Sequence, residues 1–177
     1  MSHNNEGRKP YVIRVNLETV AMGSIPGTSL IILRPGEESE FRGNILPICV
    51  GPVEAACIGR ALNPEQTARP MTHALLHATI AQMGGKVEHV SIDKVLGTVF
   101  YASITIKRTC DSVTMDARPS DAIALAVRAR APIFVDEKVM RSASFPAWVN
   151  VPKEEQKAMQ EEFHTFVETL KPEDFTC

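Results

Sequence analysis

The chain has 177 residues, of which 44% are hydrophobic and 23% are charged, and its formal net charge is −2. This composition is ordinary for a globular protein of one domain and supplies enough apolar residues for a full core. The negative net charge argues against a protein that binds nucleic acid regardless of sequence, because such binding depends on cations meeting phosphates. Residues 153–177 carry seven acids and three lysines, so the rest of the chain is mildly basic, at +2.

No apolar run approaches the roughly 18 residues of a membrane-spanning helix, and the polar opening MSHNNEGRKP lacks the apolar stretch of a signal peptide. We therefore expect a cytoplasmic protein without a membrane partner. The four cysteines form no CxxC pair, so neither a disulfide framework nor a structural zinc site is indicated. Cys49 and Cys57 lie in apolar runs typical of strands, where a thiol behaves as a small hydrophobic group.

The first half of the chain is dominated by predicted strands. Residues 11–17 alternate between apolar and polar side chains, and residues 29–33 form a short apolar run. Residues 45–50 are again typical of a strand. Residues 53–62 contain Gly59 as their one breaker, and their pattern fits either a helix or a strand.

Two helices are predicted to begin at Pro70 and Pro119, because proline is favoured at the first helical position. The first helix ends at Gly84-Gly85 and carries an apolar stripe, made by Thr72, Leu76, Ile80 and Met83. The second helix, over about 120–130, is apolar on nearly every side, which is typical of a buried helix. Further strands are predicted at residues 87–92, 99–106, 113–116 and 133–135.

The phrase Ala-Arg-Pro occurs twice, at residues 68–70 and 117–119, and each copy opens a helical segment that leads into a strand. Residues 92–96 after the first copy correspond to residues 135–140 after the second. Two copies are too few for a solenoid, which needs three or more repeats to bury its core. We therefore predict an α+β fold in which duplicated strand-helix-strand units form a mixed β-sheet domain.

Three regions are predicted along the chain: a domain at 1–140 that contains the duplication, a linker at 141–152, and an acidic amphipathic helix with its tail at 153–177. The apolar residues of the last helix follow the spacing i, i+4, i+7 and i+11, at Met159, Phe163, Phe166 and Leu170. This helix needs a surface to cover, on its own domain or on another subunit. We expect a homo-oligomer, either a dimer or a trimer.

The densest polar sequence is DARPSD, from Asp116 to Asp121, at the junction of a predicted strand and helix. A helix start presents free N–H groups and the positive end of the helix dipole, so a phosphate would be well placed beside Arg118 and Ser120. The structural alternative is that Ser120 or Asp121 caps the helix while Arg118 pairs with one of the two aspartates.

The corresponding place in the first copy holds Arg69 and His73, so a symmetric arrangement would put both arginines in one cleft. His73 and His77 lie four positions apart, which suits two ligands of one metal, but this spacing is common in helices that bind none. Glu54 follows a Gly-Pro turn and suits a general base, a ligand of a hard cation such as Mg²⁺, or an acid paired with Arg60.

Four stretches of the sequence resemble the bifunctional nuclease domain, a family also described as a conserved domain of unknown function. They are LPICVGPVEAACIGRAL, RPMTHALLHATIAQMGG, GTVFYASITI and DARPSDAIALAVRARAPIFV. The resemblance covers about residues 11–140, and the ending at residues 170–175 is similar to the tail of many bacterial members. The family takes its name from plant members credited with hydrolysing RNA and DNA, so the resemblance implies a nuclease whose partner is RNA or single-stranded DNA.

The family's recognisable polar positions fall on seven residues of this chain. The nuclease interpretation gives a catalytic role to Glu54, His73, Asp116 and Asp121. It gives phosphate binding to Arg69, Arg118 and Ser120. It also implies a divalent cation, Mg²⁺ or Mn²⁺, with Asp116 and Asp121 as its ligands. Members usually carry an aspartate after the motif histidine, where this chain has Ala74.

The alternative from a different class is a non-enzymatic oligomeric module that binds an anionic ligand or a partner protein. The chain has low net basicity and only 6% aromatic residues for stacking on bases. It also lacks a phosphate-binding glycine loop, a nucleophile elbow and a catalytic triad. In this interpretation the polar residues at the helix starts are caps and ion pairs.

Overall fold

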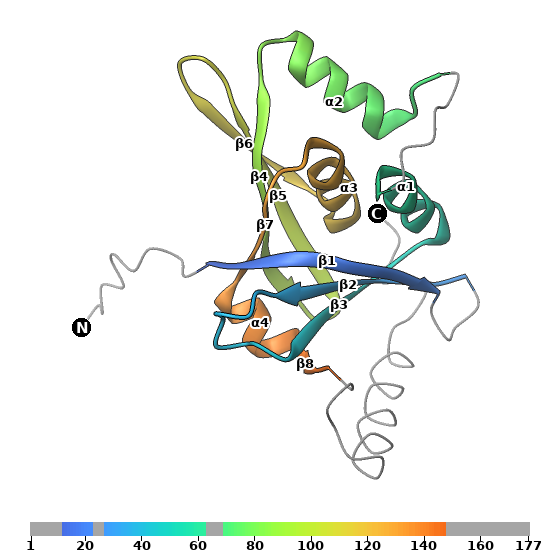
Figure 1. The fold of residues 1–177 in the computed structure, drawn as a ribbon, viewed down its shortest axis with the longest axis vertical. Helices are drawn as coiled ribbons and strands as arrows, with labels where there is room; N and C mark the ends of the chain where they lie inside the picture. Colours follow the sequence, from blue (N-terminus) through green and yellow to red (C-terminus); the bar gives the residue numbers. More distant parts are fainter. Residues whose placement is uncertain (1–11, 23–26, 63–68, 148–177) are drawn as a thin grey trace.

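The computed structural model describes residues 12–22, 27–62 and 69–147. Four helices and eight strands make up this part of the chain and confirm the predicted α+β class (Figure 1). In chain order they are β1 (Val12–Met22), β2 (Ser29–Pro35), β3 (Asn44–Val50), α1 (Pro52–Leu62), α2 (Thr72–Gln82), β4 (Lys86–Leu96), β5 (Val99–Lys107), β6 (Ser112–Ala117), α3 (Pro119–Ala129), β7 (Ile133–Asp136), α4 (Glu137–Ala143) and β8 (Phe145–Pro146).

All eight strands belong to one sheet, in the order β6-β5-β4-β7-β1-β2-β3-β8. The pair β4–β7 is parallel and the other pairs are antiparallel, so the sheet is mixed, as predicted. Figure 1 shows a strong twist, with β1, β2 and β3 running across the direction of β4 and β5. Every strand predicted from the sequence is present, and residues 53–62, which fitted either type, are helical in α1.

The structure contains a duplication, but its unit differs from the predicted one. An antiparallel three-strand meander followed by a helix occurs twice, as β1-β2-β3-α1 and as β4-β5-β6-α3. The two meanders lie on either side of β7, which is antiparallel to β1 and parallel to β4. They are therefore related by an approximate two-fold rotation about an axis through β7. The predicted strand-helix-strand unit matches β6-α3-β7. The first predicted copy does not match it, because within the described residues the element before α2 is helix α1 and not a strand.

Helices α1 and α3 lie side by side on one face of the sheet, and α2 packs against α3 (Figure 1). The middle of α3 is fully buried, from Ala122 to Ala126, which confirms the prediction from its uniformly apolar sequence. Cys49 lies in β3 as predicted, but Cys57 lies in α1 and not in a strand. The Gly51-Pro52 turn directs this apolar run into a helix, because proline fixes the backbone angle that the first helical turn needs.

The apolar stripe predicted on α2 does not face the core. Among its four residues only Ile80 is buried, while Leu76 and Met83 are exposed, the latter to 79%. The neighbouring Leu75 is also exposed. Helix α2 lies at the edge of the helical layer and contacts α3 and the start of β4, so its remaining apolar surface faces outward.

The predicted linker at 141–152 is only partly described: it begins inside α4, continues through β8, which pairs with β3, and then leaves the described residues at 148. The helix predicted at 153–177 lies outside the described residues. In the portion of the chain that the structure describes, no helix has the length and apolar character needed to cross a membrane.

Candidate functional site

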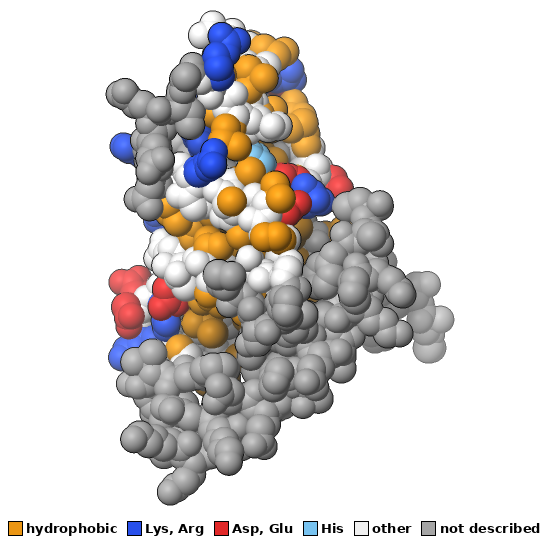
Figure 2. Space-filling model, turned by 90° about the vertical axis from the view of Figure 1, so that its right-hand side faces the viewer, with side chains coloured by type: hydrophobic (Ala, Val, Ile, Leu, Met, Phe, Trp, Pro, Cys, Tyr) orange, Lys and Arg blue, Asp and Glu red, His pale blue; other side chains and the backbone are white. Residues whose placement is uncertain are grey.

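The starts of three helices come together at one side of the molecule. Glu54 lies in the first turn of α1, His73 in the first turn of α2 and Asp121 in the first turn of α3. Arg118 is the residue that precedes α3. Figure 2 shows acidic, basic and histidine side chains gathered on this side, with hydrophobic side chains around them. We call Glu54, His73, Arg118 and Asp121 the helix-start cluster.

The duplication explains why two carboxylates meet here. The N–H of Ala55 donates to the carbonyl oxygen of Gly51, and the N–H of Ala122 donates to that of Arg118, so Gly51 and Arg118 precede their helices in equivalent positions. A proline follows each of them, and the acid stands two residues after the proline. Because α1 and α3 pack side by side, the equivalent acids face each other across the approximate two-fold axis.

Asp121 is hydrogen-bonded through both carboxylate oxygens. Oδ1 lies 3.0 Å from Nε2 of His73, and Oδ2 accepts a hydrogen bond of 2.9 Å from Nε of Arg118. Burial acts to raise the pKa of Asp121, but the hydrogen bonds from Arg118 and His73 outweigh it, so the pKa lies below its ordinary value. Asp121 is therefore ionised at neutral pH.

Arg118 links the two halves of the duplication. Its Nη1 lies 3.4 Å from Oε1 of Glu54, and its Nη2 lies 3.5 Å from Oδ1 of Asp121. Both contacts are longer than the 2.7–3.2 Å usual for N–H···O hydrogen bonds, so the shorter contact from Nε fixes the guanidinium. Glu54 thus pairs with Arg118 and not with Arg60, whose Nη1 donates to the sulfur of Met71.

Gly51 is a position of the candidate site that the sequence prediction missed. A Cβ atom at this position would overlap Oε2 of Glu54, because the glutamate side chain folds back over the start of α1. A side chain at position 51 would therefore push the carboxylate of Glu54 out of its present position. The signal was present in the sequence, since Gly-Pro before Glu54 corresponds to Arg-Pro before Asp121.

Hydrogen bonds within the helix-start cluster thus join four of the seven predicted site residues. Of the other three, Arg69 is exposed just before α2, and Ser120 is buried in the first turn of α3 at 6% exposure. Asp116 lies on the edge strand β6, opposite Ser103 of β5. Arg118 is the N-cap residue of α3, and its side chain does not cap the helix.

The same geometry tests the expected divalent cation. Within residues 12–22, 27–62 and 69–147, no three side chains of His, Cys, Asp or Glu form a group that could hold a metal ion. Nε2 of His73 is engaged with Asp121, and the guanidinium of Arg118 stands between the carboxylates of Glu54 and Asp121. A cation there would meet this positive charge, so the arrangement as it stands does not fit a metal.

A family model for the bifunctional nuclease domain matches residues 31–147, a range that contains all seven predicted site residues. The chain belongs to the bifunctional nuclease domain family. It is 33% identical over 134 residues to an uncharacterised protein of Mycobacterium tuberculosis, a match that covers 73% of this chain and 80% of that protein.

Two plant relatives in this family carry the name bifunctional nuclease 2. The protein from Oryza sativa subsp. japonica is 32% identical over 150 residues, which cover 77% of this chain and 45% of the plant protein. The protein from Arabidopsis thaliana is 31% identical over 135 residues, which cover 75% of this chain and 40% of the plant protein. The chain therefore matches less than half of either plant protein.

Proposed function

We propose that this protein is a nuclease that hydrolyses phosphodiester bonds of RNA, DNA or both, with the helix-start cluster as its active site. The observation that carries the proposal is the hydrogen bond between His73 and Asp121 beside Arg118. A histidine oriented by a carboxylate can accept a proton, and a neighbouring guanidinium can stabilise charge on a phosphate. Membership of the family supports the same reaction.

In the proposed mechanism the two ring nitrogens of His73 have different roles. When Nε2–H donates to the ionised Asp121, the lone pair is on Nδ1. Nδ1 takes a proton from water as the water oxygen attacks phosphorus, and the bond from phosphorus to the leaving oxygen breaks. Asp121 stabilises the imidazolium that forms, as the aspartate does in serine protease triads.

Arg118 stabilises the negative charge that develops on the non-bridging phosphate oxygens. Its terminal amino groups make the long contacts to Glu54 and Asp121, so a phosphate oxygen at ordinary hydrogen-bond distance would compete with them effectively. Glu54 holds the guanidinium before the substrate arrives. Arg69 and Ser120, at the starts of α2 and α3, are the proposed further phosphate ligands, together with the N–H groups of these helix starts.

A divalent cation supplies Lewis acidity and a more acidic bound water when it participates in phosphodiester hydrolysis. Its expected ligands, Asp116 and Asp121, would hold it only if Asp121 gave up its contacts with Arg118. Because the guanidinium of Arg118 contacts both carboxylate oxygens of Asp121, no step of the mechanism above passes through a metal.

Cleavage of labelled RNA and single-stranded DNA by the purified protein tests the proposal, with assays in Mg²⁺, in Mn²⁺ and in chelator. We expect cleavage by the unaltered protein and its loss in His73→Ala. Equal cleavage by both proteins would show that the activity comes from another site or from a contaminant. Cleavage only with added metal would assign the cation a direct role and would require Asp121 to exchange Arg118 for it.

A second candidate function is a non-enzymatic oligomeric module that binds an anionic ligand or a partner protein. The observation that favours it is the pairing of Arg118 with two carboxylates, because such a cluster also stabilises the junction of the two repeats without any chemistry. The exposed apolar residues of α2 offer a surface for a partner. Absence of cleavage under all conditions, together with a stable folded protein, would favour this function.

A further inference from the structure

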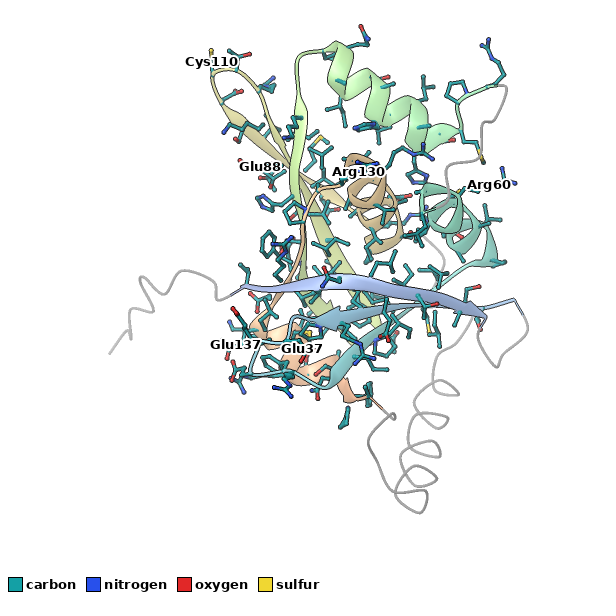
Figure 3. All side chains as sticks on the ribbon, in the orientation of Figure 1. Glu37, Arg60, Glu88, Cys110, Arg130 and Glu137 are labelled. Atoms are coloured by element: carbon teal, nitrogen blue, oxygen red, sulfur yellow. The ribbon has the colours of Figure 1, made fainter. Side chains whose placement is uncertain are left out.

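The sheet has one face without a helix among the described elements. Helix α3 covers one side of β4 and β5, and α1 lies over β1 and β2 on the same side; no described helix lies on the opposite side (Figure 1). Helix α4 also packs toward the covered side, because its Val139 and Met140 belong to the same core as Val90 and Ile123. Figure 3 shows Glu88 of β4 pointing away from the helices. We call the uncovered side of β4, β5, β6, β7 and β1 the open sheet face.

Strand alternation identifies the side chains on this face. Core residues such as Ile133, Val135 and Ile13 point toward the helices, so the residues between them point the other way. The strand registers align five such residues in one row across five strands. In sheet order they are Asp116, Ser103, Ser91, Phe134 and Arg14. With strands about 4.8 Å apart, the row is roughly 19 Å long.

Aromatic rings and cations occur together along this face. Phe134 stands next to His89, with ring centroids 5.7 Å apart and an interplanar angle of 80°. The exposed Arg14 is the cross-strand neighbour of Phe134. Farther along, Nζ of Lys94 lies 4.4 Å from the centroid of the Tyr101 ring. Rings beside cations are the groups that stack on bases and contact the phosphates of single-stranded nucleic acids.

The row leads to the helix-start cluster. The member at the β6 end of the row, Asp116, lies on the edge strand, two residues before Arg118. The chain passes there from the sheet to the start of α3. A strand of nucleic acid that crosses the row therefore leaves the sheet at the edge nearest to Arg118.

We propose that the open sheet face binds single-stranded nucleic acid, with Phe134 as the stacking platform and Arg14 as a phosphate contact, and leads it over β6 to the helix-start cluster. The ligand class rests on the proposed function. The location is independent of it, because no residue of the row takes part in the hydrogen bonds of the cluster. Double-stranded nucleic acid would fit poorly, since its bases are not free to stack on a ring.

Fluorescence anisotropy with labelled oligouridylate and oligodeoxythymidylate tests the proposal. Phe134→Leu retains an apolar side chain, and we expect it to weaken binding about tenfold. Arg14→Ala should weaken binding as well and reduce its dependence on salt. The matched control is Arg42→Ala, which removes an arginine that is 70% exposed in the loop between β2 and β3. It should bind like the unaltered protein.

Equal binding by Phe134→Leu, Arg14→Ala and the control would overturn the proposal. So would a lower molar mass of these two variants in solution, because the open sheet face would then be a contact between subunits. Measuring binding and cleavage by His73→Ala separates this proposal from the nuclease function, because His73 belongs to the helix-start cluster and not to the open sheet face. Binding at the open sheet face without cleavage by the unaltered protein would reject only the nuclease function, whereas cleavage unaffected by Phe134→Leu and Arg14→Ala would reject only the nucleic-acid path.

Discussion

Asp121 accepts from Arg118 through one carboxylate oxygen and contacts His73 through the other, at 2.9 and 3.0 Å. The histidine comes from a helix start 48 positions earlier in the chain. One carboxylate thus connects α2 to α3, and through Arg118 it connects α3 to α1. In the proposed mechanism, proton transfer by His73 and charge stabilisation by Arg118 both depend on Asp121.

His73 and His77 provide a matched pair of substitutions, because they lie one turn apart on α2 and both are half-buried. His73→Ala should lower kcat by about 10²–10⁴, the usual contribution of a general acid or base. His77→Ala should leave kcat within a few-fold of the original value. Steady-state kinetics on labelled RNA measures both, and an equal loss in the two variants would indicate damage to α2 instead of lost chemistry.

The lowered pKa of Asp121 predicts the direction of a pH effect on stability. The folded-state pKa lies below the unfolded value of about 3.9. The ionised carboxylate therefore adds to the free energy of unfolding at every pH above that value, and the contribution is lost as pH falls through the folded pKa. Because Asp121 is 35% exposed, solvent screening limits the contribution to about 1 kcal/mol or less.

Urea unfolding of the unaltered protein and of Asp121→Asn, at about pH 7 and about pH 3, measures this effect. The difference between the two proteins should shrink at the lower pH. The same shift means that an acid limb in the pH dependence of activity above about pH 4 belongs to another group, since Asp121 stays ionised there. An NMR titration of Asp121 with a midpoint above the ordinary aspartate value would contradict this account.

Gly51 and Gly59 form a pair of glycines at the start and in the body of α1. Gly51→Ala should displace the carboxylate of Glu54 and reduce kcat, because the new Cβ would occupy the position of Oε2. Nothing lies within 4 Å of a Cβ added at Gly59, so Gly59→Ala should stabilise the helix by about 0.5–1 kcal/mol and leave activity unchanged. Unaltered kcat in Gly51→Ala would show that Glu54 does not need its present position.

The exposed apolar residues in and directly after α2 predict where subunits meet in the expected dimer or trimer. Leu75 and Met83 are 56% and 79% exposed, and burying such residues is a usual source of subunit association. Leu75→Glu with Met83→Glu should reduce the molar mass measured by light scattering to that of one chain. Leu96→Glu, at an equally exposed residue where β4 ends, should have no effect. Retention of the oligomer in the first variant would move the interface to another surface.

Sequence patterns predicted the individual elements well, because strand alternation and the apolar helix α3 are local features. The duplicated unit was harder to predict than the individual helices and strands. The repeated Ala-Arg-Pro predicts that α2 and α3 are equivalent helices. Residues 92 and 135, which that repeat matches, are partners in the parallel pair β4–β7. The structural repeat instead equates α1 with α3, whose starts share a proline, an acid two residues later and the alanine that follows the acid.

The candidate site was predicted as a set of residues but not as a geometry. The pairing of Glu54 with Arg118, which replaces the expected alternative of Arg60, joins positions 64 residues apart. No local pattern encodes such a contact, because it arises from the packing of α1 beside α3. The apolar stripe of α2 was misjudged for a similar reason: a helical pattern shows which residues share a face but not what that face contacts.

Cleavage by a double variant tests the central claim most directly. Arg118→Ala/Asp121→Ala removes the arginine–aspartate pair of the helix-start cluster. Arg108→Ala/Asp111→Ala removes a pair of the same types and spacing between β5 and β6, away from the cluster. We predict that the first variant loses cleavage of RNA and single-stranded DNA while the second retains the rate of the unaltered protein. Equal rates in all three proteins would contradict an active site at the helix-start cluster.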